Sequence, residues 1–199
     1  MKFMGKLLFL AACVAVAQSS GPVQSAPAAP AAGSDASPLA TLVKQQFGST
    51  FTIPAKFAAP IVADFDGDGV EDVAIVADSK EPFPDSYAFK YQVGDPYNAY
   101  FGLNNPQVSA AFHADPEHSH HVLIIFGSGA EGWHAATPKA KFVLINLPFD
   151  SLEVGRLLVS KTKPPIFVIK AHEAQIMESA IWWDAKKKRW KWLPGDTVE

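Results

Sequence analysis

PIVADFDGDGVEDVAIVA, residues 60–77, decides the fold that we predict for this chain. Two short apolar runs rich in β-branched residues, 60–63 and 73–77, flank an acidic, glycine-containing stretch. Runs of this length and composition are typical of β-strands, and glycine with aspartate is typical of the turn between them. We therefore expect two strands joined by the loop 64–72.

The loop is unusually rich in carboxylates for its length. Five acidic side chains occur within nine residues: Asp64, Asp66, Asp68, Glu71 and Asp72. Like charges this close oppose folding into one turn unless a counter-ion neutralises them. Gly67 and Gly69 let the backbone wrap around an ion, and hard oxygen donors suit Ca²⁺. We predict a Ca²⁺ site with side-chain ligands and one backbone carbonyl: Asp64, Asp66, Asp68, Asp72 and, through its carbonyl, Val70.

The residues on either side of the loop indicate which kind of metal-binding loop it is. A helix-loop-helix calcium hand needs a Glu at position 12, which here is Ile75, and helices on both sides. A second alternative is a haloacid-dehalogenase-like, Mg²⁺-dependent phosphatase with Asp64 as nucleophile and Asp66 as acid/base. That pattern wants Thr or Val in place of Asp68, followed by a helix or cap. A plain acidic surface turn is the third alternative.

These residues resemble a known family. The loop and its strands are similar to the FG-GAP or VCBS type of calcium repeat of integrin α-chain propellers and many secreted bacterial proteins, with the signature Asp-x-Asp-Gly-Asp-Gly-x-x-Asp. The segment VLIIFGSG, residues 122–129, resembles the apolar strand of that family that ends in Phe-Gly. The resemblance implies a calcium site in a blade-like unit. A propeller needs at least four blades, so one repeat does not imply a whole propeller.

The N-terminus predicts export. Lys2 and Lys6 precede an apolar run, and Ala15-Val16-Ala17 offers small residues for cleavage, so residues 1–17 are predicted to be a secretory signal peptide. We expect a secreted or periplasmic protein. The alternative is a lipoprotein anchored through Cys13, because Leu10-Ala11-Ala12-Cys13 resembles a lipobox.

Residues 18–36 contain mostly Ala, Pro, Ser, Gly and Gln, a composition that predicts a disordered linker. Residues 37–199 then form a single β-rich domain. Ser37-Pro38 predicts a helix start, and Gly48 predicts its end. Strands are expected at 51–53, 61–64, 73–77, 122–126, 142–147, 166–172, 175–184 and 188–193, with a hairpin turn at 184–187; the segment 152–158 is not assigned. The predicted fold is mainly β: an antiparallel sheet domain resembling a propeller blade or small sandwich, with one short N-terminal helix.

A long insertion, 78–121, lies between two of these strands and is rich in aromatic residues. Loops of this length are often functional. Its aromatic side chains either pack against the sheet or form a binding surface: Phe83, Tyr87, Phe89, Tyr91, Tyr97, Tyr100, Phe101 and Phe112. A surface of this kind predicts a glycan or a cell-envelope protein as partner. Four tryptophans on the C-terminal hairpin are expected to stabilise the sheet as cross-strand aromatic pairs, with a ligand platform as the alternative: Trp182, Trp183, Trp190 and Trp192.

Other functional classes find less support in the sequence. Without Lys2 and Lys6, 15 of the 17 basic residues remain against 20 acidic residues, a formal charge of −5. This charge argues against a nucleic-acid partner. No apolar run is long enough to span a bilayer. His118 and His120 could form a transition-metal pair, but a solvated loop is the simpler interpretation. No catalytic constellation is evident, so we expect a calcium-binding interaction module rather than an enzyme.

Overall fold

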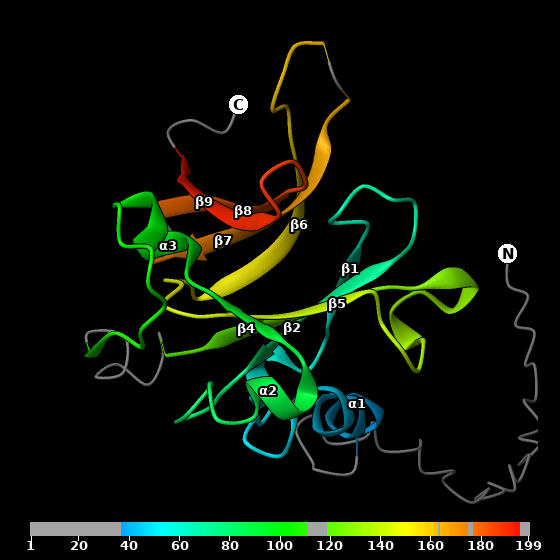
Figure 1. The fold of residues 1–199 in the computed structure, drawn as a ribbon. Helices are drawn as coiled ribbons and strands as arrows, with labels where there is room; N and C mark the ends of the chain where they lie inside the picture. Colours follow the sequence, from blue (N-terminus) through cyan, green and yellow to red (C-terminus); the bar gives the residue numbers. More distant parts are fainter. Residues whose placement is uncertain (1–36, 111–118, 163, 175–176, 196–199) are drawn as a thin grey trace, which may run out of the picture. The chain divides into compact units, whose positions relative to one another are not determined.

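The computed structural model describes residues 37–110, 119–162, 164–174 and 177–195, all of which lie in the unit Ala31–Glu199 (Figure 1). The predicted signal peptide 1–17, with Cys13, and the linker 18–36 fall outside the described residues. Within them, nine strands form two sheets and the helices are few and short. The mainly β prediction is therefore confirmed. None of the described helices has the length and apolar content of a membrane span.

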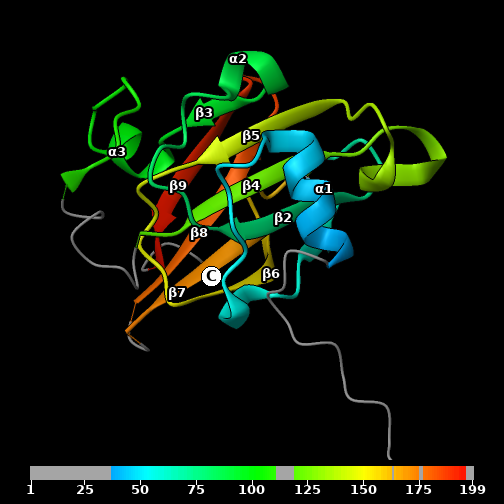
Figure 2. The ribbon, with the colours of Figure 1, turned by 90° about the horizontal axis from the view of Figure 1, so that it is seen from below.

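The first sheet has five strands in the order β1-β2-β4-β5-β3. Figure 2 shows β2, β4, β5 and β3 side by side. They are β1 (Ile61–Ala63), β2 (Asp72–Ala77), β3 (Gln92–Gly94), β4 (His121–Phe126) and β5 (Ala140–Leu144). Strands β1, β2, β4 and β5 pair antiparallel. The edge strand β3, which the sequence did not predict, pairs in parallel with β5. The first sheet is thus mixed rather than wholly antiparallel.

The second sheet is a four-stranded antiparallel meander, with the order β6-β7-β8-β9. Its strands are β6 (Ser151–Leu157), β7 (Ile166–Glu173), β8 (Met177–Asp184) and β9 (Arg189–Pro194). Strand β6 covers the segment left unassigned in the sequence. It is an edge strand with mostly exposed side chains, which explains its weak apolar signal. The β8–β9 hairpin occurs where predicted, with Trp183 opposite Trp190.

The two sheets share one hydrophobic core. Ile124 and Phe126 of β4 pack in the same buried cluster as Ile169 of β7 and Ile181 of β8. This arrangement corresponds to the small sandwich among the two predicted alternatives. The other face of the first sheet packs against helix α1 (Pro38–Phe47) through a second cluster.

Strand β2 is buried on both faces, which accounts for its continuous apolar run. All six of its residues are buried. Val73 and Ile75 lie in the α1 cluster, whereas Ala74 and Val76 lie in the cluster shared with the second sheet. A strand covered on both sides cannot alternate polar and apolar residues. Each fully buried aliphatic side chain contributes about 1.5–3 kcal/mol relative to an exposed one.

Helix α1 begins and ends as predicted. The Ser37 side chain accepts a hydrogen bond from Ala40 N at 3.0 Å, which satisfies one of the free amides of the first turn. Pro38 follows at the first helical position. Gly48 ends the helix with φ 98°, a left-handed conformation that favours glycine. The predicted strand 51–53 forms only an isolated bridge between Thr52 and Asp78, because Pro54 has no amide hydrogen with which to continue a ladder.

The insertion 78–121 is a folded segment rather than one long loop. It contains helix α2 (Ser86–Phe89), strand β3 and helix α3 (Pro96–Tyr100), and short 3₁₀ helices lie elsewhere at Ala55–Phe57 and Gly129–His134. Its aromatic side chains divide into two groups. Phe83, Phe89, Tyr91 and Tyr97 pack against the cores. The exposed group is Tyr87, Tyr100 and Phe101; Phe112 falls outside the described residues.

Candidate metal centre

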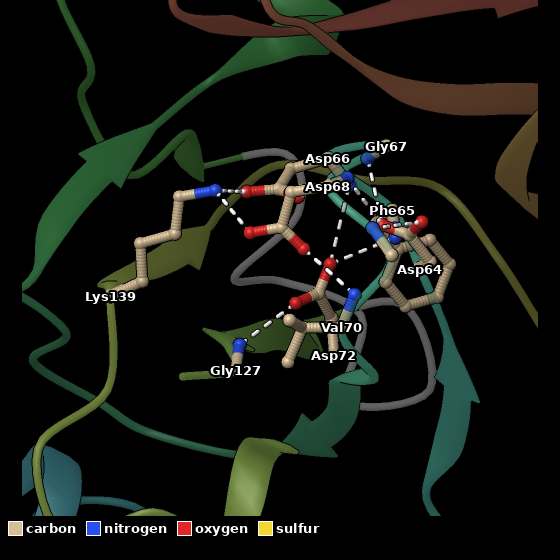
Figure 3. A network of polar contacts seen from close by, with 10 residues as sticks. Asp64, Phe65, Asp66, Gly67, Asp68, Val70, Asp72, Gly127 and Lys139 are labelled. Carbon is tan, nitrogen blue, oxygen red and sulfur yellow. Dashed lines mark hydrogen bonds and ion pairs between the residues drawn. The ribbon is translucent and has the colours of Figure 1, made fainter. Parts of the chain in front are cut away.

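The loop 64–72 joins β1 to β2, and the carboxylate of Asp64 organises its first half (Figure 3). Asp64 Oδ1 accepts hydrogen bonds from Gly67 N at 2.8 Å and Asp68 N at 3.1 Å, and its Oδ2 accepts one from Gly69 N at 2.8 Å. Gly67 and Gly69 adopt φ 79° and 87°. These angles strain a residue that carries a Cβ, so the glycines permit the turn.

Asp66 and Asp68 both form ion pairs with the same lysine, although the Asp66 side chain is 5 % exposed and that of Asp68 is 31 % exposed. Asp68 N donates to Asp66 Oδ1 at 3.2 Å, and Val70 N donates to Asp68 Oδ1 at 2.8 Å. The ammonium of Lys139, which precedes β5, lies 2.6 Å from Asp66 Oδ2 and 2.5 Å from Asp68 Oδ2 (Figure 3). Its hydrogen bond lowers the pKa of Asp68, and the two carboxylates raise the pKa of Lys139. This lysine is distant along the chain, and no pattern in the sequence points to it.

Asp72 is the buried anchor of the site. Its side chain is 1 % exposed, and its carboxylate accepts three backbone hydrogen bonds. Phe65 N and Asp66 N donate to Oδ2 at 2.8 and 3.2 Å, while Gly127 N donates to Oδ1 at 2.8 Å. Burial raises the pKa of Asp72 from 3.8 to about 7, although the backbone amides favour its ionised form. One carboxylate therefore fastens the loop to the residue that follows β4.

Gly127 is required by the close approach of two backbones. A Cβ at this position would lie 2.2 Å from the carbonyl oxygen of Glu71 and 2.7 Å from the carbonyl carbon of Gly132. Only glycine can bring its amide within reach of Asp72 here without moving the chain. Phe126, directly before it, is 2 % exposed and packs in the shared core. The loop and the Phe-Gly segment, which are far apart in the sequence, thus meet at Asp72.

The geometry of three carboxylates is compatible with one calcium ion. Oxygens of Asp64, Asp66 and Asp72 lie within 4.8 Å of one another, and no other such group of His, Cys, Asp or Glu occurs in the described residues. Ca²⁺ binds oxygen at about 2.3–2.6 Å, so two ligand oxygens on the same ion can be up to about 5 Å apart. The donor set, all carboxylate oxygen, suits a hard cation.

Two predicted ligands differ in their placement. Asp68 lies outside this group, and its carboxylate is bonded to Lys139 and to the amide of Val70. Val70 takes part through this N–H, which the sequence did not predict. Asp64, Asp66 and Asp72 thus form the group of nearby carboxylates, and the ligand roles of Asp68 and of the Val70 carbonyl stay predictions.

The histidine segment gives no second metal site in the described residues. His118 falls outside them. His120 is 8 % exposed, its Nδ1 lies 2.5 Å from Asp78 Oδ1, and its ring packs edge-on against Phe57. The expectation of a solvated loop is wrong for His120, because the aromatic contact and the Asp78 pair bury it.

Comparisons with protein-family models, with curated proteins and with solved structures give no match to this chain. The likeness to the FG-GAP or VCBS repeat therefore stays a prediction that rests on the loop and on the Phe-Gly segment.

Proposed function

We propose that this protein is an exported, calcium-stabilised β-domain that serves as a binding or interaction module, with Ca²⁺ as a structural ion. The observation that carries the proposal is the buried carboxylate of Asp72. It lies with Asp64 and Asp66 in one group of oxygens and also holds the amide of Gly127. An ion bound to these carboxylates would fix the β1–β2 loop against the end of β4.

The charge balance of the loop supports a site of modest affinity. Lys139 already neutralises part of the charge on Asp66 and Asp68. The ion-free loop therefore has a positive partner, and an incoming cation has to compete with it. Extracellular calcium modules function with dissociation constants of about 10⁻⁴–10⁻³ M, so such a site suffices outside the cytoplasm. The predicted signal peptide supports export.

The phosphatase alternative finds less support. That class of enzyme has Thr or Val at the position of Asp68, whose carboxylate here pairs with Lys139. The loop is also followed by strand β2 rather than by a helix or cap. A binding role instead agrees with exposed aromatic residues on and after α3, Tyr100 and Phe101, which suit a glycan or an envelope protein.

Calorimetric titration of Ca²⁺ and Mg²⁺ into the metal-free protein tests the proposal. We expect Ca²⁺ to bind more tightly than Mg²⁺ and, at ten times its Kd, to raise the free energy of unfolding by about 1.4 kcal/mol. Glu71→Gln is the matched control, because Glu71 is an exposed acidic neighbour outside the oxygen group. Absence of calcium binding, or an equal loss of binding in Glu71→Gln and Asp72→Asn, contradicts the structural-ion proposal.

The raised pKa of Asp72 gives this titration a pH dependence. Ca²⁺ requires the ionised carboxylate, so a proton competes with it below the pKa of about 7. We expect the calcium Kd to weaken by up to about tenfold per pH unit below pH 7 and to be constant above it.

In the calcium-free protein, ionisation of Asp72 lowers the stability of the fold instead of favouring ion binding. The folded state binds this proton more tightly than the unfolded chain, whose pKa is 3.8. The stabilisation is therefore fully present below about pH 3.8 and is lost as the pH rises through about 7. Denaturant melts in a chelator across this range measure it. A calcium Kd that does not change between about pH 6 and about pH 8 would contradict the assignment of Asp72 as a ligand.

A further inference from the structure

A second candidate site shares no residue with the loop 64–72 and lies where the edge strands β3 and β9 meet helix α3. A pocket of about 230 Å³ is lined by β3, by α3 and the turn after it, by Phe142 of β5 and by the β8–β9 hairpin. Both β3 and β9 are edge strands of their sheets, and α3 packs against β9 (Figures 1 and 2). The pocket is therefore assembled from segments that the sequence keeps far apart.

The charge of the pocket is positive. Lys188 and Arg189 line it, both are exposed, and neither forms an ion pair with a described residue. The only acidic side chain of the lining, Asp95, is 7 % exposed and already bonded. Asp95 accepts hydrogen bonds from Asn98 N at 3.0 Å, from Asn98 Nδ2 at 2.8 Å and from Asn146 Nδ2 at 2.5 Å. Two cations thus remain available to a ligand.

The walls of the pocket are aromatic and aliphatic. Phe142, Trp183 and Trp190 form one side, with ring centroids of Phe142 and Trp183 4.9 Å apart. Val93 and Leu103 contribute apolar surface from the insertion. Drug-sized ligands occupy pockets of about 300–1,000 Å³, so this smaller pocket fits a ligand that contains a single ring.

The hairpin turn keeps a cation where the backbone favours glycine. Lys188 has φ 50°, a left-handed conformation that costs a residue with a Cβ about 1–2 kcal/mol. Strain of this kind is characteristic of functional positions. Here it places a lysine beside Arg189, whose planar guanidinium can bind a carboxylate through two parallel hydrogen bonds.

We propose that this pocket binds a small carboxylate whose body is a single ring, with the ring against Phe142, Trp183 and Trp190 and the carboxylate on Arg189 and Lys188. Two sources share this chemistry: an aromatic acid, whose ring stacks on the tryptophans, and a sugar acid, whose C–H face packs on them. The proposal goes beyond the calcium module and does not depend on an ion in the loop.

Titration of benzoate and of galacturonate into the ¹⁵N-labelled protein, in the presence of EDTA, tests the proposal. We expect millimolar binding of at least one acid, with shifts of the indole N–H signals of Trp183 and Trp190. Binding by benzoate alone identifies the aromatic source, and binding by galacturonate alone identifies the sugar source. The neutral analogues benzamide and galactose are expected to bind at least about tenfold more weakly than the acid they match.

Charge-removal variants on one turn supply the matched control. Arg189→Gln is expected to weaken binding at least about tenfold, because it removes a charged hydrogen-bond donor from the pocket. Lys186→Gln removes the same charge from an exposed residue of the same turn that does not line the pocket, and is expected to leave the Kd unchanged. Both variants alter exposed side chains, so their melts should match the parent. No shift with either acid, equal binding of the neutral analogues, or equal losses in both variants overturns the proposal.

Discussion

The loop 64–72 and the pocket beside α3 are built in opposite ways. In the loop, Asp64 accepts hydrogen bonds from amides that lie only three to five residues further along the chain. The pocket takes its walls from residues 92–106, from Phe142 and from the β8–β9 hairpin. Local chemistry of the first kind is visible in a sequence, because spacing alone determines which groups meet. Chemistry of the second kind exists only after the sheets have formed.

The loop nevertheless depends on two distant anchors. Gly127 donates to Asp72 across 55 residues, and Lys139 binds Asp66 across 73. If the local bonds determine the turn and the distant ones hold it in place, the largest losses of stability should occur at the distant, buried contact. The changes below test this ranking.

Asp72→Asn is expected to have the largest effect. The amide would place a donor among three backbone N–H groups and leave at least one of them unpaired in a buried position. We expect a loss of about 3 kcal/mol in the free energy of unfolding. Urea denaturation in EDTA at about pH 5, where the folded carboxyl is protonated and its stabilisation is present, measures it. Glu71→Gln, in the adjacent exposed position, should change stability by less than about 0.5 kcal/mol; equal losses would show that Asp72 is no anchor.

Gly127→Ala tests the same contact from the other side. The new Cβ would meet backbone atoms at 2.2 and 2.7 Å, which cannot move as a side chain would. We expect a loss of about 2 kcal/mol, with weaker calcium binding because Asp72 shifts. Gly129→Ala is the control, since its φ is 62° and its Cβ would meet no atom within 4 Å. That change should cost about 1 kcal/mol and leave calcium affinity unchanged. The reverse order of the two losses would contradict the close approach seen at Gly127.

The same contrast explains what the sequence could predict. Strands β1 and β2, the turn at Gly67 and Gly69, and helix α1 were predictable because short-range spacing and caps determine them. The ion pair between Asp68 and a lysine 71 residues away was not predictable from spacing, and the ligand role of Asp68 stays a prediction. Strand β3 was missed because a three-residue edge strand in parallel pairing has almost no periodicity. The hairpin tryptophans could be recognised as a candidate ligand platform, but the pocket could not be predicted because its other walls come from distant segments of the chain.

Lys139→Gln tests what the distant lysine contributes to the loop. Half of the lysine side chain is exposed, with 47 % accessible, so its two ion pairs are partly screened. We expect a loss of about 0.5–1 kcal/mol in EDTA, and a calcium Kd about threefold tighter because the competing charge is gone. Lys80→Gln removes an exposed lysine that is closer in sequence and should change neither quantity. Weaker calcium binding in Lys139→Gln would contradict competition between the lysine and the ion.

Lys188→Gly is expected to have the smallest effect on stability, and its sign is the opposite of the others. Glycine relieves the left-handed strain at φ 50°, but it also adds entropy to the unfolded chain, so we expect a net gain of about 0.5 kcal/mol. The ring carboxylate should bind several-fold more weakly, because one of its two cations is lost. Urea denaturation and the acid titration measure the two quantities on one sample. If the variant gains stability and loses affinity, the strained lysine belongs to the ligand site. If its affinity is unchanged, the left-handed conformation of Lys188 reflects only the geometry of the turn. The calcium loop offers no comparable exchange of stability for affinity. Its left-handed positions, Gly67 and Gly69, are already glycines. The carboxylates that would bind the ion also hold the turn together.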